Sequence, residues 1–242
     1  MDLTGTTALV TGAARRVGRA ISLALAGAGA NVAVHYNRSA DEADSLADEI
    51  RRLGRRAECF QADLADPDAI EGLFAAVGKV MPSLLVLVNN ASTYPRTPLE
   101  TLTADQWDAV LAVNARAPAL CIRHAAAIMP EGGSIVNITD SGAQDGWAGY
   151  PAYCASKAAL ESLTRSAARA LAGRNIRVNA VGPGVVAWED QTDEAVKAKV
   201  LAHVPMKRPG SPEDIAAAVV FLAKSDYITA QILRVDGGWQ TS

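Results

Sequence analysis

Tyr153 and Lys157 stand four residues apart in the segment YCASK. Because side chains at this spacing share one face of a helix, both can reach the same atom of a substrate. A tyrosine whose pKa is about 10 is a weak proton donor or base at neutral pH. A lysine ammonium one turn away should lower the pKa of Tyr153 by stabilising the phenolate. The pair predicts proton transfer at a heteroatom, as needed when hydride reaches the neighbouring carbon.

Asp140 precedes Tyr153 by thirteen residues and ends a strand-like run. A carboxylate accepts hydrogen bonds from N–H groups, and it donates one only when a raised pKa keeps it protonated. Ser141 is the next residue, and a slip of one residue at a strand end points to the other face of the sheet. The sequence leaves open whether Asp140 or Ser141 faces the substrate.

A turn containing Gly12 and Gly18 follows the first strand-like run, in the segment TGAARRVGRA. Glycine permits positive φ and close backbone approach, and a helix N-terminus favours an anionic pyrophosphate. A tight turn without a ligand would use the same two glycines. The position directly after the first strand favours a dinucleotide-binding loop.

The second strand-like run ends in HYNRS, residues 35–39, without an acidic residue. An Asp or Glu at this point would hydrogen-bond the ribose 2′-hydroxyl of NAD. Arg38 and Ser39 instead offer a guanidinium and a hydroxyl at a helix start, which suit a 2′-phosphate. The alternative is that Arg38 is solvated and Ser39 only caps the next helix. We predict NADPH as the cofactor.

These residues need elements that position them, and short apolar runs alternate with helical patterns along the chain. The expected strands are 7–11, 31–36, 57–61, 83–89, 133–139, 175–181 and 231–236, and the expected helices are 17–28, 40–53, 67–80, 104–128, 152–172 and 212–223. This alternation predicts an α/β fold, a single Rossmann domain over 1–242 with a doubly wound, seven-stranded parallel sheet. The stretch 182–211 is expected to be a substrate loop or lid.

Composition excludes several classes of protein. The net charge of −3 over 242 residues argues against a nucleic-acid or anionic-lipid surface. The three cysteines are far apart and have no zinc-site spacing, so we expect no metal site and a reducing cytoplasm. The longest uncharged apolar stretch, 20–34, falls short of the roughly 20 residues of a membrane span. We expect a cytoplasmic protein that acts on a small molecule.

Together, these motifs resemble the short-chain dehydrogenase/reductase family. Thr11, Gly12 and Gly18 match the family's TGxxxGxG loop, but Arg16 replaces its middle glycine. An arginine there cannot tuck under the cofactor and should point into the active site. The YxxxK pair is the family's catalytic motif, in which the lysine also holds the nicotinamide ribose.

The resemblance implies further cofactor contacts at the carboxyl ends of the strands. These positions are Arg15, Arg16, Val17, Asn37, Asp63, Leu64, Asn90, Ala91, Ser92, Tyr153, Lys157, Pro183, Gly184 and Val186. Two of them have simpler explanations, because Asp63 could cap the following helix and Asn90 could satisfy loop backbone. Asn114 matches an asparagine that kinks its helix and holds a water joining the lysine to bulk solvent. A plain helical asparagine is the alternative.

Several departures from the usual family pattern resemble its pteridine reductase branch. They are Arg16, residues 35–39, Ser92, Tyr94 and Asp140. The family carries a serine thirteen residues before the tyrosine to hydrogen-bond a substrate carbonyl. Pteridine reductases carry Asp there, which accepts from pterin N–H groups. Tyr94 matches an aromatic residue that stacks the pterin against nicotinamide. Trp188 could cover the pocket, and a subunit contact is the alternative.

The resemblance therefore predicts NADPH-dependent reduction of a dihydropterin or dihydrofolate-like ring, with Arg16, Ser92, Tyr94, Asp140 and Trp188 contacting it. The alternative is a 3-oxoacyl-thioester or other ketone reductase of the same family. A catalytically silent binding protein is disfavoured by the intact Tyr153, Lys157 and Asn114. The segments 104–128 and 152–172 pair across subunits in the family, which implies a homotetramer.

Overall fold

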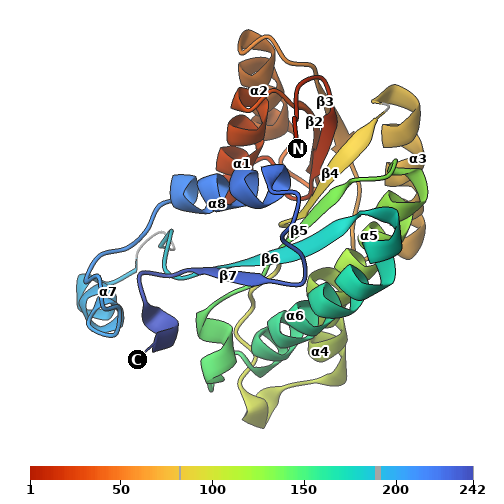
Figure 1. Ribbon diagram of the computed structural model, residues 1–242. Coiled ribbons are helices and arrows are strands. Elements are labelled where there is room, and N and C mark those ends of the chain that lie inside the picture. Colours follow the sequence, from red (N-terminus) through yellow and green to blue (C-terminus); the bar gives the residue numbers. More distant parts are fainter. Residues whose placement is uncertain (82, 189–191, 242) are drawn as a thin grey trace.

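The apolar runs form seven strands, which pair in parallel in the order β3-β2-β1-β4-β5-β6-β7 (Figure 1). The computed structural model describes residues 1–81, 83–188 and 192–241. The strands are β1 (Thr7–Val10), β2 (Asn31–Tyr36), β3 (Ala57–Gln61), β4 (Leu84–Asn89), β5 (Ser134–Ile138), β6 (Arg177–Pro183) and β7 (Ile232–Val235). The predicted fold class is confirmed.

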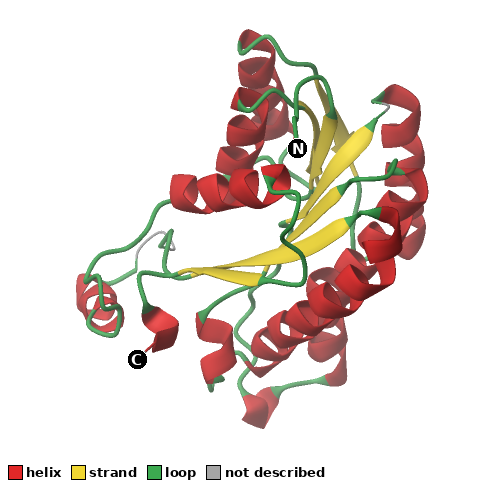
Figure 2. Cartoon of the chain, in the orientation of Figure 1, coloured by secondary structure: helices red, strands yellow, loops and turns green. Residues whose placement is uncertain are grey.

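Helices cover both faces of the sheet. They are α1 (Arg16–Gly27), α2 (Ala40–Arg52), α3 (Pro67–Val80), α4 (Ala104–Leu111), α5 (Ala117–Ile128), α6 (Pro151–Leu171), α7 (Glu194–Leu201) and α8 (Pro212–Lys224). Helices α1, α2 and α8 pack on one face, and α3, α5 and α6 pack on the other (Figure 2).

Successive strand residues alternate between two hydrophobic cores. Val10 and Val88 belong to the core under α1 and α8, whereas Leu9 and Leu87 belong to the core under α3 and α5. A strand buried on both faces reads as a continuous apolar run, and this explains the sequence of β1.

The chain changes direction across the sheet at β1, which lies between β2 and β4. After β3 at one edge, the chain returns to form β4 on the other side of β1. At such a reversal the connections leave the two strands in opposite directions and open a crevice at their carboxyl ends. The turn after β1 and the segment after β4 therefore meet at the place where this fold binds ligands.

Two expectations about the elements were wrong. The segment 104–128 is not one helix, because a π-helical turn over Ala112–Arg116 separates α4 from α5. Insertion of one residue into a helical turn is a known cause of a kink, and this turn contains Asn114. The stretch 182–211 is not wholly irregular, because it contains α7, which is capped by Asp193 through the backbone N–H of Ala195.

A chain of buried polar side chains joins the sheet to α6. The Asn89 Nδ2 donates to the Asn137 Oδ1 at 2.8 Å, and the Asn137 Nδ2 donates to the Thr164 Oγ1 at 2.8 Å. All three side chains are buried. Since buried polar groups are stable only when paired, this chain fixes α6 against β4 and β5.

Asn137→Ala should lower the free energy of unfolding, because it leaves the buried Asn89 amide without its acceptor, whereas Thr164 keeps its hydrogen bond to the Leu160 carbonyl oxygen. We expect a loss of about 1–3 kcal/mol from the one buried group left unpaired. Urea unfolding measures this loss, with Asn37→Ala as the matched removal of an exposed amide. An unchanged urea midpoint for Asn137→Ala would contradict the assigned role.

Candidate active site

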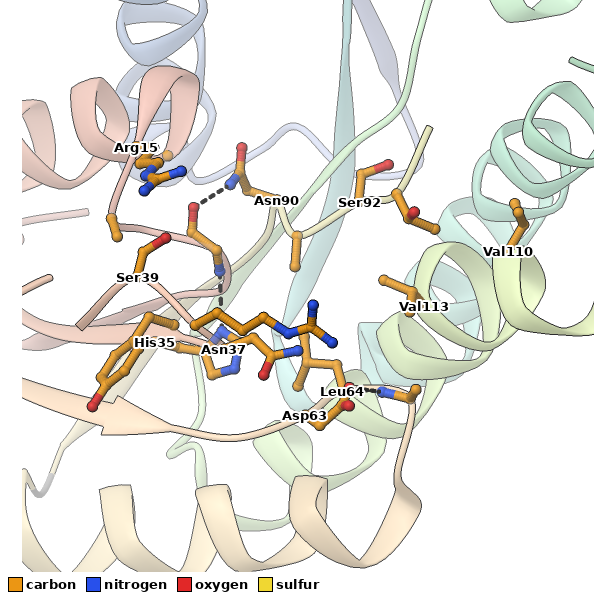
Figure 3. A pocket seen from close by; sticks show the side chains of 18 of the residues that line it. Arg15, His35, Asn37, Ser39, Asp63, Leu64, Asn90, Ser92, Val110 and Val113 are labelled. Atoms are coloured by element: carbon orange, nitrogen blue, oxygen red, sulfur yellow. Dashed lines mark hydrogen bonds between the residues drawn. The ribbon is translucent and has the colours of Figure 1, made fainter. Parts of the chain in front are cut away.

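A cavity of about 870 Å³ lies at the carboxyl ends of the central strands. It reaches from the loop between β1 and α1 and the end of β2 to Val110 and Val113, at the junction of α4 and the π-helical turn (Figure 3). The predicted residues that line it are Gly12, Arg15, Arg16, Val17, Gly18, Asn37, Arg38, Ser39, Asp63, Leu64, Asn90, Ala91 and Ser92. Its volume lies in the range of about 300–1,000 Å³ that is usual for ligand pockets.

The loop between β1 and α1 is built around its glycines. Gly12 has φ of +60°, and a Cβ at Gly18 would lie 2.2 Å from the Gly12 carbonyl oxygen. The Asn90 amide donates to the carbonyl oxygens of Thr11 and Gly12 at 2.9 and 3.0 Å. Asn90 therefore satisfies loop backbone, as the simpler explanation proposed, while it also lines the cavity.

Arg16 begins α1 with φ of +48°, a conformation that side chains rarely adopt. Its side chain is exposed, lines the cavity and places Nη2 3.4 Å from the Trp188 carbonyl oxygen. Arg16 therefore lies beside the segment after β6 instead of tucking under the loop. Residues 189–191 of the expected lid lie outside the described part of the chain.

The end of β2 presents polar groups to the cavity. Ser39 occupies the N-cap position of α2 but makes no side-chain capping hydrogen bond, so the capping explanation is wrong. Arg38 and Asn37 are exposed there. Arg15, across the loop, pairs with Glu42 in the first turn of α2 and holds the pKa of that carboxyl below its usual range. This end of the cavity fits a phosphate group.

His35 supports the loop through hydrogen bonds that the sequence reasoning did not predict. The Gly12 N–H donates to its Nδ1 at 3.0 Å, so Nε2 carries the ring proton and donates to the Ala62 carbonyl oxygen at 3.2 Å (Figure 3). Burial lowers the pKa of His35 to about 4. The signal available in the sequence was a histidine in a largely apolar strand-like run, residues 31–36.

Asp140 and Tyr153 are in direct contact. The Tyr153 hydroxyl donates to the Asp140 Oδ2 at 2.7 Å, and Oδ1 accepts from the backbone N–H groups of Gly142 and Ala143. Burial raises the pKa of Asp140, although these donors and Lys157 oppose the rise. Ser141 is fully buried and donates to the Gly182 carbonyl oxygen at 2.9 Å, so Asp140 is the residue that faces Tyr153.

The predicted lowering of the Tyr153 pKa is wrong. Burial first, and then the negative charge of Asp140, raise the pKa of Tyr153 well above its usual value. Lys157 lies 5.5 Å from the centroid of the Tyr153 ring and donates to the Ile138 carbonyl oxygen at 3.0 Å. Burial lowers the pKa of Lys157 to about 8. The pair therefore holds a protonated phenol, which suits a proton donor better than a base.

Asn114 connects α6, the catalytic helix that carries Tyr153 and Lys157, to the loop after β4. Its Oδ1 accepts from the Thr93 N–H at 2.8 Å and the Ser92 hydroxyl at 3.2 Å. Its Nδ2 donates to the Thr93 carbonyl oxygen and to the Ser156 hydroxyl, which in turn donates to the Tyr153 carbonyl oxygen. Asn114 is thus more than a plain helical asparagine, and its role in a water relay stays a prediction.

Four other predicted residues, Tyr94, Pro183, Gly184 and Val186, lie outside the described lining of the cavity. Tyr94 packs its ring edge-on against Tyr153. Pro183 accepts from the Ser141 N–H at 2.9 Å, and the Gly184 N–H donates to the Val235 carbonyl oxygen at 3.0 Å. Val186 packs against the core under α1 and α8. The sequence reasoning missed Trp147 and Tyr150, although both stand within six residues of Tyr153.

In the part of the chain that the structure describes, no helix has the length and apolar character needed to cross a bilayer. Within the same residues, no group of three His, Cys, Asp or Glu side chains could hold a metal ion.

Comparison with known proteins agrees with this geometry over almost the whole chain. A family model described as enoyl-(acyl carrier protein) reductase matches residues 12–240. The 3-oxoacyl-[acyl-carrier-protein] reductase FabG of Staphylococcus aureus (strain Mu50 / ATCC 700699) is 40% identical over 238 residues, which are 96% of each chain. A short-chain type dehydrogenase/reductase of Picea abies is 38% identical over 98% of this chain and 93% of its own.

Solved structures are similar over the same length. A blue fluorescent protein from a metagenomic library, in complex with NADPH, has a TM-score of 0.94 at 38% identity and covers 99% of both chains. The angucycline C-6 ketoreductase LanV with bound NADP has a TM-score of 0.93 at 35% identity, covering 100% of this chain and 98% of its own.

His35→Gln tests the hydrogen bonds beneath the loop, because a glutamine amide can accept from Gly12 and donate to Ala62 without titrating. The folded wild type keeps His35 neutral down to a pKa of about 4, whereas the unfolded chain binds a proton near pH 6.5. Stability of the wild type should therefore fall, relative to His35→Gln, by about 3 kcal/mol between pH 7 and pH 4. Denaturant unfolding across that range measures the difference, and parallel pH curves would contradict it.

Proposed function

The chain belongs to the short-chain dehydrogenase/reductase family, and on that premise we propose that it reduces a ketone carbonyl to an alcohol with NADPH as the hydride donor. The observation that carries the proposal is the protonated Tyr153 hydroxyl held against Asp140 at the carboxyl edge of the sheet. The ketone is favoured over the predicted pterin because FabG and LanV are named for the reduction of keto groups. The pteridine reductase branch is not confirmed.

The described residues fit the cofactor. Gly12, Gly18 and the N-terminus of α1 would hold the pyrophosphate, and Arg38 and Ser39 would hold the 2′-phosphate. Along the rest of the cavity we propose contacts from Arg15, Arg16, Val17, Asn37, Asp63, Leu64, Asn90, Ala91 and Ser92. NADPH bound in this way supplies the hydride that reaches the carbonyl carbon.

Tyr153 supplies the proton. As hydride reaches the carbon, the Tyr153 hydroxyl donates its proton to the carbonyl oxygen, and the product is a secondary alcohol. The buried Lys157 ammonium, 5.5 Å from the ring centroid, stabilises the resulting phenolate. Asp140 accepts a hydrogen bond of 2.7 Å from the phenol hydroxyl and so fixes the orientation of Tyr153.

Pteridine reduction is the second candidate, and Asp140 is the observation that favours it. An ionised Asp140 accepts hydrogen bonds from ring N–H and amino groups, which a dihydropterin offers and a ketone lacks. Arg16 and Tyr94 would contact such a ring. We keep this substrate class as the comparison in the experiment below.

We also propose a cytoplasmic homotetramer. Support comes from the family's use of the segments 104–128 and 152–172 as subunit contacts. Ile128, at the end of α5, is 42% exposed in the single chain, as a contact residue would be.

Wild-type enzyme should reduce an acetoacetyl thioester faster than dihydrobiopterin, with NADPH oxidation followed at equal substrate concentrations.

Tyr153→Phe keeps the ring but loses the hydroxyl proton, so kcat should fall by about 10²–10⁴ while the Kd for NADPH is unchanged. Asp140→Ser should retain ketone reduction, because a hydroxyl donates to a carbonyl oxygen, and should lower any pterin reduction tenfold or more. Faster reduction of the pterin by the wild type, lost in Asp140→Ser, would establish the second candidate instead.

NADPH should be preferred to NADH, and Arg38→Ala should remove most of that preference. The lost charge-assisted hydrogen bond is worth roughly 1.5–3 kcal/mol, or about ten- to hundredfold in kcat/KM for NADPH. Arg52→Ala, which removes an exposed arginine at the other end of α2, is the matched control. Equal kcat/KM for the two cofactors in the wild type would overturn the assignment.

A further inference from the structure

Three aromatic rings form a cluster with the catalytic Tyr153, although only 5% of the chain is aromatic. Tyr94 stacks on Tyr150 with ring centroids 4.3 Å apart and planes 4° apart. The Tyr94 and Tyr153 rings are nearly perpendicular, and their centroids are 4.6 Å apart. Trp147 lies nearly parallel to Tyr153, at 6.2 Å and 11°, and edge-on to Tyr94 and Tyr150. We call Tyr94, Trp147 and Tyr150 the aromatic rim.

Backbone contacts hold the aromatic rim in place. The Tyr150 N–H donates to the Trp147 carbonyl oxygen at 2.9 Å, and the Thr97 N–H donates to the Gly149 carbonyl oxygen at 2.9 Å. The second bond joins the loop that carries Tyr94 to the segment that carries the other two rings. A Cβ at Gly142 would lie 2.4 Å from the Trp147 indole, so this glycine makes room for the ring two residues after Asp140.

The aromatic rim is not fully covered by protein. Tyr94 is 41% exposed, and Trp147 and Tyr150 are half-buried. Rings that served only to pack the core would be expected to be buried more completely. The ring centroids of Tyr94 and Trp147 lie 4.6 and 6.2 Å from that of Tyr153, whose hydroxyl must reach the carbonyl of a substrate if it is to donate to it.

We propose that the aromatic rim selects ketones whose carbonyl is conjugated with a flat aromatic ring, and that Trp147 and Tyr150 are specificity-determining residues. Aromatic rings prefer offset-stacked or edge-on partners at centroid distances of about 4.5–7 Å. The rim offers both geometries, because Tyr94 and Tyr150 form a stack and Trp147 stands across it. A saturated chain or ring gains contact area at this surface but has no π face for it to meet.

The inference rests on the proposed ketone reduction and narrows its substrate. The test compares 1-tetralone with 1-decalone, two bicyclic ketones of similar size that differ in one aromatic ring. We expect kcat/KM of the wild type to be at least tenfold higher for 1-tetralone. Trp147→Leu and Tyr150→Leu should reduce that ratio several-fold through a higher KM for 1-tetralone, and Tyr150→Phe, which keeps the ring, should preserve it.

Tyr227→Leu is the control, because Tyr227 is 99% exposed in the loop between α8 and β7. This substitution should leave kcat/KM unchanged for both ketones. The Kd for NADPH reports whether each variant is folded. Equal kcat/KM for the two ketones in the wild type, or reduction of an acetoacetyl thioester without 1-tetralone, overturns the ring preference but leaves ketone reduction standing. If no ketone is reduced, the proposed function itself fails. If Trp147→Leu does not fold, the wild-type ratio and the two Tyr150 variants decide.

Discussion

The part-buried hydrogen bond between the Tyr153 hydroxyl and the Asp140 carboxyl, 2.7 Å long, is the interaction around which the active site is arranged. Burial raises the pKa of both groups, so each keeps its proton more readily than it would in water. Lys157, also buried and 5.5 Å from the centroid of the Tyr153 ring, does not reverse this rise. A site of this kind gives up a proton in the transition state and does not store a phenolate beforehand.

The loop that carries Asp140 is held from several directions. Asp145 accepts from the Trp239 indole N–H at 2.7 Å, and Gln240 donates to the Ser141 carbonyl oxygen at 2.5 Å. Gln144 donates to the buried Glu161 of α6, which also pairs with Arg234 of β7 at 2.6 Å. The C-terminal segment and the catalytic helix therefore fix the same few residues. Because an ordered carboxyl needs an ordered loop, these contacts support the geometry of the Tyr153 bond.

The cofactor side of the site is formed mainly by the backbone of the loop between β1 and α1 and by the side chains that hold that loop in place. Gly12 is held from above by Asn90 and from below by His35, and Gly18 allows the helix to approach the loop closely. The Asn114 amide then joins the segment after β4 to α6 through Ser156. The π-helical turn over Ala112–Arg116 carries this amide.

The sequence alone determined the seven strands, the glycine loop after the first of them and the YxxxK pair, because these depend on periodicity and on spacing along a single element. It also predicted NADPH as the cofactor, because Arg38 and Ser39, and no Asp or Glu, stand at the end of the second strand. Only the tertiary structure decided that Asp140 and not Ser141 faces Tyr153, because β6 supplies the carbonyl that binds Ser141. The raised pKa of Tyr153 and the meeting of the aromatic rim likewise come from burial and from contacts between distant segments, which no local pattern encodes.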